Sequence, residues 1–345
     1  MASTLAARPI PSGIAARQTP ALGGRFFRLG VAAVVCTYLL IIAGATVRVT
    51  GSGLGCPDWP TCHGQLIPPL ETAALIEYTH RLLGALTSPL ILAMPVSAWL
   101  FRRERRILYP ALALPFLLAL QIGLGAFVVW LELPPLAVLV HLGFAMLILG
   151  VLVWIATLAA PSAGTATVSD APKTAGLSAA TAPSRLGTLL TATAVVIFAL
   201  VLTGAYTRAS GASIACAGFP GCVVPQEALN ALPNGGAGLV HVHLLHRTMA
   251  YLTSALVLVS VIAVWRQGGR PERFAAAAWV ASVLIQVAIG IAAVSTGLPT
   301  VLRGAHVAGA AAVWACSVLA LAIHLRTNSP SPSGRPTLGG SPGLG

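Results

Sequence analysis

Residues 44–62 read GATVRVTGSGLGCPDWPTC, and residues 204–222 read GAYTRASGASIACAGFPGC. Each stretch follows a long apolar run and contains two cysteines with five residues between them. The aligned positions are offset by 160 throughout. Similarity at a fixed offset is the mark of a repeated unit, so the two stretches predict that the chain contains the same unit twice.

Further matches follow each stretch in the same order, at offsets of 165 or 166. They pair His80 with His246, Arg81 with Arg247, Gln121 with Gln286, and His141 with His306. Shared glycines and alanines are common by chance, whereas shared cysteines, histidines, arginine and glutamine in one order are not. The repeat therefore covers most of both halves.

Composition places this repeated unit in a membrane. Of the 345 residues, 57% are hydrophobic and only 8% are charged, with a mean hydropathy of +0.87. Soluble domains carry about 25% charged residues. Apolar runs long enough to cross a bilayer as helices lie near 29–48, 78–101, 107–131, 136–159, 186–206, 239–265, 274–297 and 302–325.

The basic residues predict the orientation, because cytoplasmic loops are enriched in Lys and Arg. With the N-terminus inside, 15 basic residues lie in inner segments and 3 in outer segments. The inner ones are Arg8, Arg17, Arg25, Arg28, Arg102, Arg103, Arg105, Arg106, Lys173, Arg185, Arg266, Arg270, Arg273, Arg326 and Arg335, and the outer ones are Arg48, Arg208 and Arg303. We expect both termini to be cytoplasmic. The +12 net charge does not indicate nucleic-acid binding, because it is dispersed among short loops.

We therefore expect an all-α integral membrane protein with two pseudo-twofold related four-helix bundles. Four spans per half make both halves enter the membrane from the same side, as a parallel repeat. The expected organisation is a disordered tail (1–24), an N-terminal half (25–159), a cytoplasmic linker (160–185), a C-terminal half (186–325) and a second disordered tail (326–345).

The paired cysteines lie in matching outer loops. Disulfides persist on the oxidising side of a membrane, so we expect Cys56 to pair with Cys62 and Cys216 with Cys222. Free thiols and a shared zinc site are the alternatives, although the spacing is wider than in usual zinc turns. Cys36 and Cys316 lie within spans, where small packing residues are expected.

Four histidines lie near the outer ends of spans that all run inward: His80, His141, His246 and His306. Ionisable residues within spans are costly and often functional. Two imidazoles per half at equal depth are typical of bis-histidine haem ligation in a helix bundle. The alternative is hydrogen bonding to neighbouring helices. Weaker candidates are His63, His241, His243 and His324, of which His241 and His243 are expected at the interface.

Three charged residues adjoin these histidines. Arg81 and Arg247 each follow one and need an anionic partner, either a haem propionate or a neighbouring carbonyl or carboxylate. Glu77 precedes His80 by three residues and should share its helix face, whereas His243 stands at the matching place in the second half. Glu77 is either a catalytic carboxylate or a residue that stabilises its helix N-terminus. This asymmetry predicts different tasks for the two halves.

Residues 44–62, the Glu77-Tyr78-Thr79-His80-Arg81 motif and the repeated cysteine pairs together resemble the haem A synthase family. The resemblance covers nearly all of residues 25–325. It implies a membrane-bound haem-dependent oxidoreductase with eight helices. Such an enzyme converts a methyl substituent of haem O to the formyl group of haem A for terminal oxidases, by two hydroxylations and loss of water.

The resemblance also implies roles for individual residues. His246 and His306 would bind haem b, His80 and His141 would line the substrate haem site, and Glu77 would be the essential carboxylate beside the substrate. Both cysteine pairs would be disulfides, structural or redox-active. The implied partners are membrane lipid, the haem O substrate, an electron donor that the sequence does not specify, and a haem O synthase (a farnesyltransferase) that supplies the substrate.

Two other classes of protein share the four histidines. A dihaem b-type electron carrier would use them, but it would give Glu77 and the cysteine pairs no task. A haem-binding or haem-export protein would perform no chemistry. Extracted haems separate these classes, because only the synthase produces hydroxylated or formylated haem.

Overall fold

A computed structural model describes residues 20–102, 104–161, 184–230, 236 and 238–328. Over these residues the chain is helical, and strand pairing is limited to two isolated bridges. The helices are α1 (Pro20–Val49), α2 (Thr72–Phe101), α3 (Arg105–Trp130), α4 (Pro135–Ala159), α5 (Arg185–Ala209), the short 3₁₀ helix η1 (Ala212–Ile214), α6 (Gln226–Asn230), α7 (Leu239–Gln267), α8 (Arg270–Ser295) and α9 (Thr300–Thr327).

Eight of the described helices are long and apolar enough to cross a membrane. They are α1 to α5 and α7 to α9, and each expected apolar run overlaps one of them. The predicted number of spans is therefore confirmed. The protein is a multi-pass membrane protein.

Three helix boundaries differ from those that hydropathy predicts. Helix α1 begins at Pro20, within the expected tail, and α9 continues to Thr327, past the expected tail boundary at 326. Helix α2 begins at Thr72 rather than near 78, so His80 lies in its third turn. The expected apolar run begins after Glu77, because this residue is charged. The helix extends further, back to Thr72, and Glu77 within it forms an ion pair with Arg81 one turn later. The remainder of the expected tails and linker lies outside the described residues.

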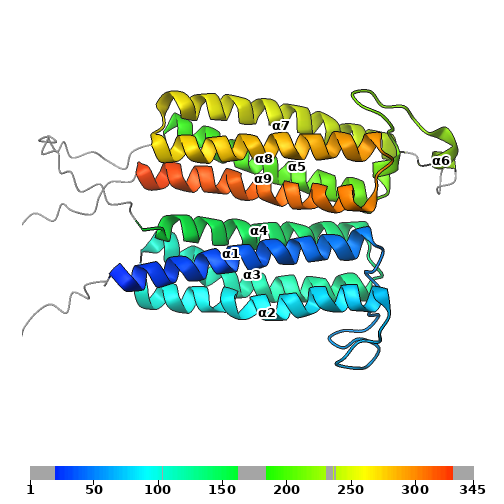
Figure 1. Ribbon diagram of the computed structural model, residues 1–345, viewed down its shortest axis with the longest axis horizontal. Coiled ribbons are helices and arrows are strands. Elements are labelled where there is room, and N and C mark those ends of the chain that lie inside the picture. Colours follow the sequence, from blue (N-terminus) through cyan, green and yellow to red (C-terminus); the bar gives the residue numbers. More distant parts are fainter. Residues whose placement is uncertain (1–19, 103, 162–183, 231–235, 237, 329–345) are drawn as a thin grey trace, which may run out of the picture.

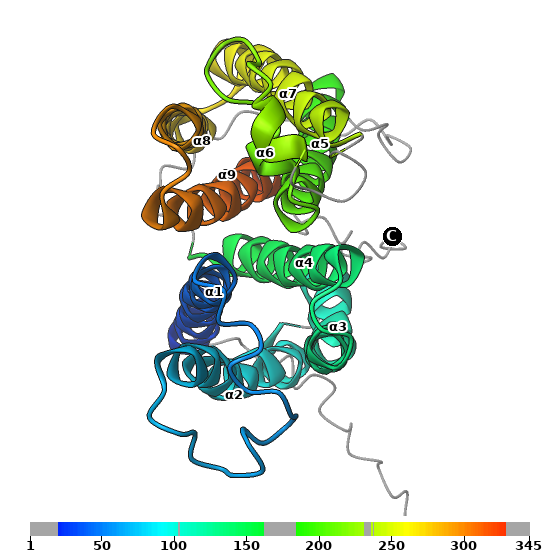
Figure 2. The ribbon, with the colours of Figure 1, turned by 90° about the vertical axis from the view of Figure 1, so that its right-hand side faces the viewer.

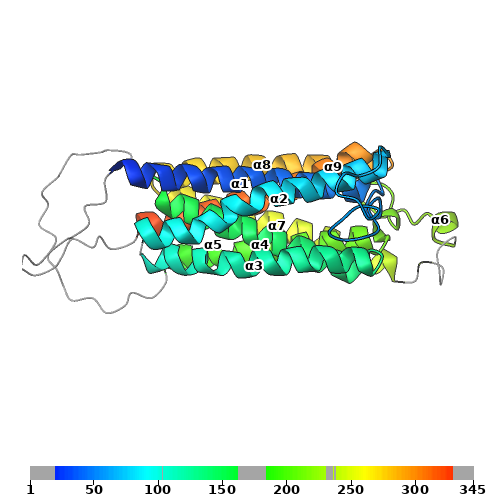
Figure 3. The same ribbon diagram turned by 90° about the horizontal axis from the view of Figure 1, so that it is seen from below.

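The helices form two groups of four that lie side by side (Figure 1). One group contains α1 to α4, and the other contains α5, α7, α8 and α9 (Figure 2). Loops 50–71 and 210–225 lie at one end, which we call the cysteine-loop end, and the start of α1 and the finish of α9 lie at the opposite end (Figures 1 and 3).

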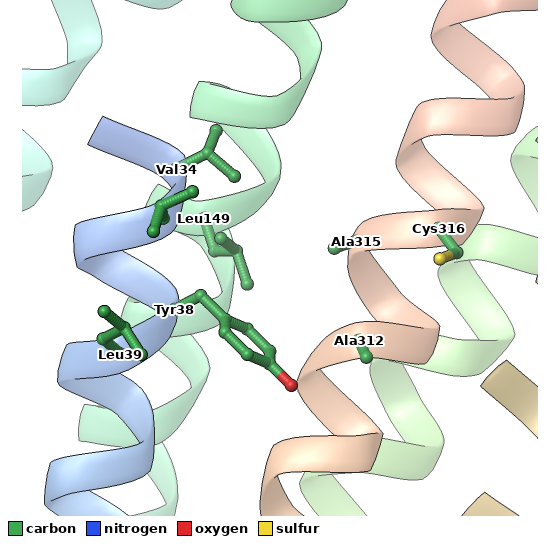
Figure 4. A pocket seen from close by; sticks show the side chains of 8 residues that line it. Val34, Tyr38, Leu39, Leu149, Ala312, Ala315 and Cys316 are labelled. Atoms are coloured by element: carbon green, nitrogen blue, oxygen red, sulfur yellow. The ribbon is translucent and has the colours of Figure 1, made fainter. Parts of the chain in front are cut away.

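Helices α1, α4 and α9 meet along the seam between the two groups. Trp314 of α9 donates its indole N–H to the carbonyl of Met146 on α4 (2.7 Å), and Tyr38 of α1 donates its hydroxyl to the carbonyl of Ala308 on α9 (3.0 Å). A cavity of about 280 Å³ lies at this seam, lined by apolar side chains together with Tyr38 and Cys316 (Figure 4). One buried hydrophobic cluster spans both groups, so they share a core.

Polar contacts tie the two groups together at the end opposite the cysteine loops. Arg326 of α9 donates to the carbonyls of Thr157 (3.2 Å) and Ala160 (2.6 Å), at the finish of α4. His324 is 5% exposed and contacts Glu272 of α8 (2.8 Å) and the Ser184 hydroxyl that caps α5 (2.9 Å). His324 therefore has a structural place, far along α9 from the other histidines.

Candidate functional site

Both cysteine pairs are disulfides. Cys56–Cys62 and Cys216–Cys222 have S–S distances of 1.97 and 1.98 Å and Cα–Cα distances of 4.6 and 4.7 Å. These are the pairings that the sequence predicts, and they leave none of the four sulfurs as a thiolate for zinc. Each closes a small loop at the cysteine-loop end of the bundle.

Arg81 fastens the first of these loops to α2. Its guanidinium donates to the carbonyls of Cys56 (2.8 Å), Asp58 (2.7 Å) and Thr61 (2.8 Å). Arg247 of α7 makes the matching contacts to Cys216 (3.1 Å) and Gly221 (2.6 Å) in the second loop. The sequence predicted either a haem propionate or a neighbouring carbonyl or carboxylate as the partner of each arginine. In the structure both arginines donate to backbone carbonyls.

Glu77 is buried beneath the first loop, with 3% of its surface exposed. One carboxylate oxygen pairs with Arg81 (2.5 Å), and the other accepts the backbone N–H of Cys56 (2.9 Å). Glu77 therefore does not cap its own helix. It joins the disulfide loop to the turn that carries His80.

Asp58 braces the same loop from within. Its carboxylate accepts the Thr61 hydroxyl and the backbone N–H groups of His63 (2.5 Å) and Gly64 (2.9 Å). The hydrogen bond from Thr61, followed by those from the backbone, lowers the pKa of Asp58 from 3.8 to about 2. The matching position in the second loop is Gly218, which has no carboxylate.

This difference predicts a pH dependence confined to one loop. Because the folded pKa lies below that of a free aspartate, the bracing is complete above about pH 4 and is lost as the pH falls toward 2. We expect the rate at which a phosphine reduces Cys56–Cys62, relative to Cys216–Cys222, to be constant down to about pH 4 and to rise below it, as measured by alkylation and mass spectrometry. Asp58→Asn should remove this dependence. Equal acceleration at Cys216–Cys222 would contradict the prediction.

Each of the four repeated histidines lies against a glycine of the neighbouring helix. For each pair we give the distance between the imidazole Cε1 atom and a Cβ atom built on the glycine. Two carbon atoms in ordinary contact are about 3.5–4.0 Å apart. The pairs are His80 with Gly44 (2.9 Å), His141 with Gly125 (3.2 Å), His246 with Gly204 (2.8 Å) and His306 with Gly290 (3.1 Å). A Cβ at Gly44 or Gly204 would force the ring to move, and one at Gly125 or Gly290 would require the ring to shift by a few tenths of an ångström.

The glycines allow the rings to approach the backbone. The Nδ1 atoms of His80, His141 and His306 are buried and have no hydrogen-bond partner. Nδ1 of His246 contacts the Thr203 hydroxyl (3.3 Å). A contact of this kind on Nδ1 orients an imidazole so that its other nitrogen can bind a metal.

In each half, the side-chain amide of one glutamine lies near the Nε2 atom of the second histidine. The Gln121 amide lies 3.3 Å from Nε2 of His141, and the Gln286 amide lies 3.4 Å from Nε2 of His306. The histidines of each half are near enough that a proton on one would repel a proton on the other. Within the described residues no three His, Cys, Asp or Glu side chains converge. Two facing imidazoles per half fit a haem iron, whose other ligands come from the porphyrin.

Among the weaker candidates, His243 is buried, with 5% of its surface exposed, and its Nδ1 has no hydrogen-bond partner. The short helix η1 packs against α7, which carries His243. His241 and His63 are exposed. The asymmetry between Glu77 and His243 remains, because both side chains are buried at matching places.

Comparison with known proteins agrees with this arrangement. A family model described as cytochrome oxidase assembly protein (COX15-CtaA) matches residues 27–318. Proteins named "Heme A synthase" are similar over most of their lengths. That of Shouchella clausii is 32% identical over 80% of this chain and 89% of the relative, and that of Symbiobacterium thermophilum is 33% identical over 73% and 80%. The chain therefore belongs to the haem A synthase family.

Proposed function

We propose that this protein is a haem A synthase, which oxidises a methyl substituent of haem O to the formyl group of haem A. The observation that carries the proposal is the pair of glycine-backed histidine sites, of which only the first has a buried carboxylate, Glu77, beside it. Two equal sites would suit a dihaem electron carrier. Unequal sites suit one bound cofactor and one substrate.

The residues divide between these tasks by half. His246 and His306 bind haem b as the resident cofactor, and His80 and His141 hold the substrate haem O. Haem b, when bound, supplies one-electron transfer. Support comes from the half-buried imidazoles, whose positions the glycines and glutamines restrict.

Glu77 acts as the carboxylate of the substrate half. Its salt bridge with Arg81 and the Cys56 N–H hold it in one place under the disulfide loop. A fixed carboxylate in a water-poor site stabilises positive charge that develops on a nearby substituent. The loop and the helices around it leave only 3% of Glu77 exposed.

We further propose that the two halves are related by a pseudo-twofold axis and that the protein lies in the cell membrane with both termini cytoplasmic. The positive-inside count of 15 against 3 supports this orientation. So does the position of the start of α1 and the finish of α9 at one end (Figure 1). The disulfide loops then face the oxidising side. A haem O synthase would supply the substrate, and a separate donor would supply electrons.

The test is haem analysis of purified protein by difference spectroscopy and chromatography. Wild type should carry haem b together with haem O or its oxidised forms. His246→Ala should lose haem b, whereas Glu77→Gln should keep haem b and lose roughly 10²-fold in product. Full product from Glu77→Gln would remove the carboxylate's role. Two haems b with no oxidised product would indicate the electron carrier instead.

A further inference from the structure

Three arginines at the cysteine-loop end each have a buried Nε atom without a hydrogen-bond partner. Arg48 lies in the last turn of α1, Arg208 in the last turn of α5, and Arg303 in the first turn of α9. Arg303 uses another nitrogen to reach the Thr300 hydroxyl (3.0 Å) and the carbonyl of Val49 (3.3 Å), and so ties α9 to the finish of α1. Arg208 is near enough to both others for their charges to repel.

No carboxylate compensates these charges in the part of the chain that the structure describes. The ion pairs there are Glu77–Arg81 and His324–Glu272. Three half-buried positive charges in mutual repulsion are unfavourable in a membrane protein unless an anion joins them. The cluster is therefore complete only with a negatively charged ligand.

The spacing along the helices relates this cluster to the second histidine pair. Arg208 follows Gly204, the glycine against His246, by four residues, and Arg303 precedes His306 by three. Residues three or four apart share a helix face. Both arginines therefore stand about one turn from the imidazoles, toward the cysteine-loop end, on the faces that carry the histidine site.

We propose that Arg208 and Arg303, with Arg48 from the other half, bind the propionate carboxylates of the haem held by His246 and His306. This rests on the proposed haem b site. Arginine donors suit carboxylates because they form paired, charge-assisted hydrogen bonds. Arg247, a sequence candidate for the same task, is already engaged by the carbonyls of the second loop. Val138 stands where the first half would need a counterpart of Arg303, so the site belongs to the second half.

The test compares two porphyrins in the full-length protein produced without haem: iron protoporphyrin and its dimethyl ester, in which the propionates are uncharged. Wild type should bind the free acid at least tenfold more tightly than the diester. Arg208→Gln and Arg303→Gln should each lower affinity for the free acid about tenfold and leave the diester unchanged. Loss of positive charge should also lower the haem midpoint potential. The matched control is Arg326→Gln, at the opposite end of α9, which should keep the wild-type preference for the free acid over the diester.

The remaining outcomes each decide a different question. If wild type binds both porphyrins equally, the propionate site is wrong although the haem site stands. If wild type binds neither, the haem site and the proposed function fail together. If the variants keep the preference for the free acid but lose co-purifying phosphatidylglycerol, the arginines bind a lipid phosphate and the proposal is overturned.

Discussion

Gly204→Ala is expected to remove most of the haem from the half that carries His246 and His306. The new Cβ would lie 2.8 Å from Cε1 of His246, so the ring must move away from α5. Overpacking of this kind costs about 1–3 kcal/mol, or roughly 5- to 150-fold in affinity. The haem-to-protein ratio and the reduced-minus-oxidised difference spectrum measure the loss.

The control separates this effect from helix stability. Alanine is a better helix former than glycine by about 1 kcal/mol, so the substitution alone should stabilise α5. Gly123→Ala on α3 adds the same methyl where nothing lies within 4 Å. It should keep full haem content and equal or higher thermal stability. A Gly204→Ala protein with wild-type spectra would show that the ring can shift without consequence, against our interpretation of the four glycines.

Arg81→Leu is expected to destabilise the protein on the order of 3 kcal/mol, because it leaves a buried carboxylate without its charged partner. Glu77 is 3% exposed and would keep only the Cys56 N–H. Three loop carbonyls would also lose their donor. In detergent we expect the apparent unfolding temperature to fall by roughly 6–12 °C, and Cys56–Cys62 to become more accessible to reductants.

The repeat provides the matched control. Arg247→Leu removes two carbonyl contacts but strands no carboxylate, since His243 stands where the first half has Glu77. Its effect should be less than half as large. Adding Glu77→Gln to Arg81→Leu should recover part of the loss. Equal effects of the two arginine substitutions would mean that the salt bridge contributes little.

The number of spans could be predicted because lipid imposes a single requirement, a long apolar helix, that hydropathy detects directly. The starts of α1 and α2 could not be predicted as well. A run of apolar residues ends at the first polar residue. The helix continues past that residue where its side chain forms an ion pair or a hydrogen bond. Glu77 is such a residue, since Arg81 compensates it one turn later.

The candidate site residues were selected from their order and spacing in the two copies, and the structure places each histidine pair in one half of the bundle. Their contacts could not be predicted. The position of Glu77 three residues before His80 predicted that both lie on one helix face, but it did not predict that Glu77 accepts the N–H of Cys56, 21 residues earlier. The glycines against the histidines were visible at matching offsets. Nothing in the sequence says which ring lies on which glycine, because that depends on how the helices pack.

The ties around the last turn of α9 have a consequence for the order of assembly. Arg326 donates to carbonyls at the finish of α4, and His324 contacts the Ser184 hydroxyl that caps α5, so one helix contacts both. The shared core also contains residues of α9. Because α9 is the last of the described helices to be synthesised, these contacts form only after the other helices have been made, and the final arrangement of the two groups is a late step of biogenesis.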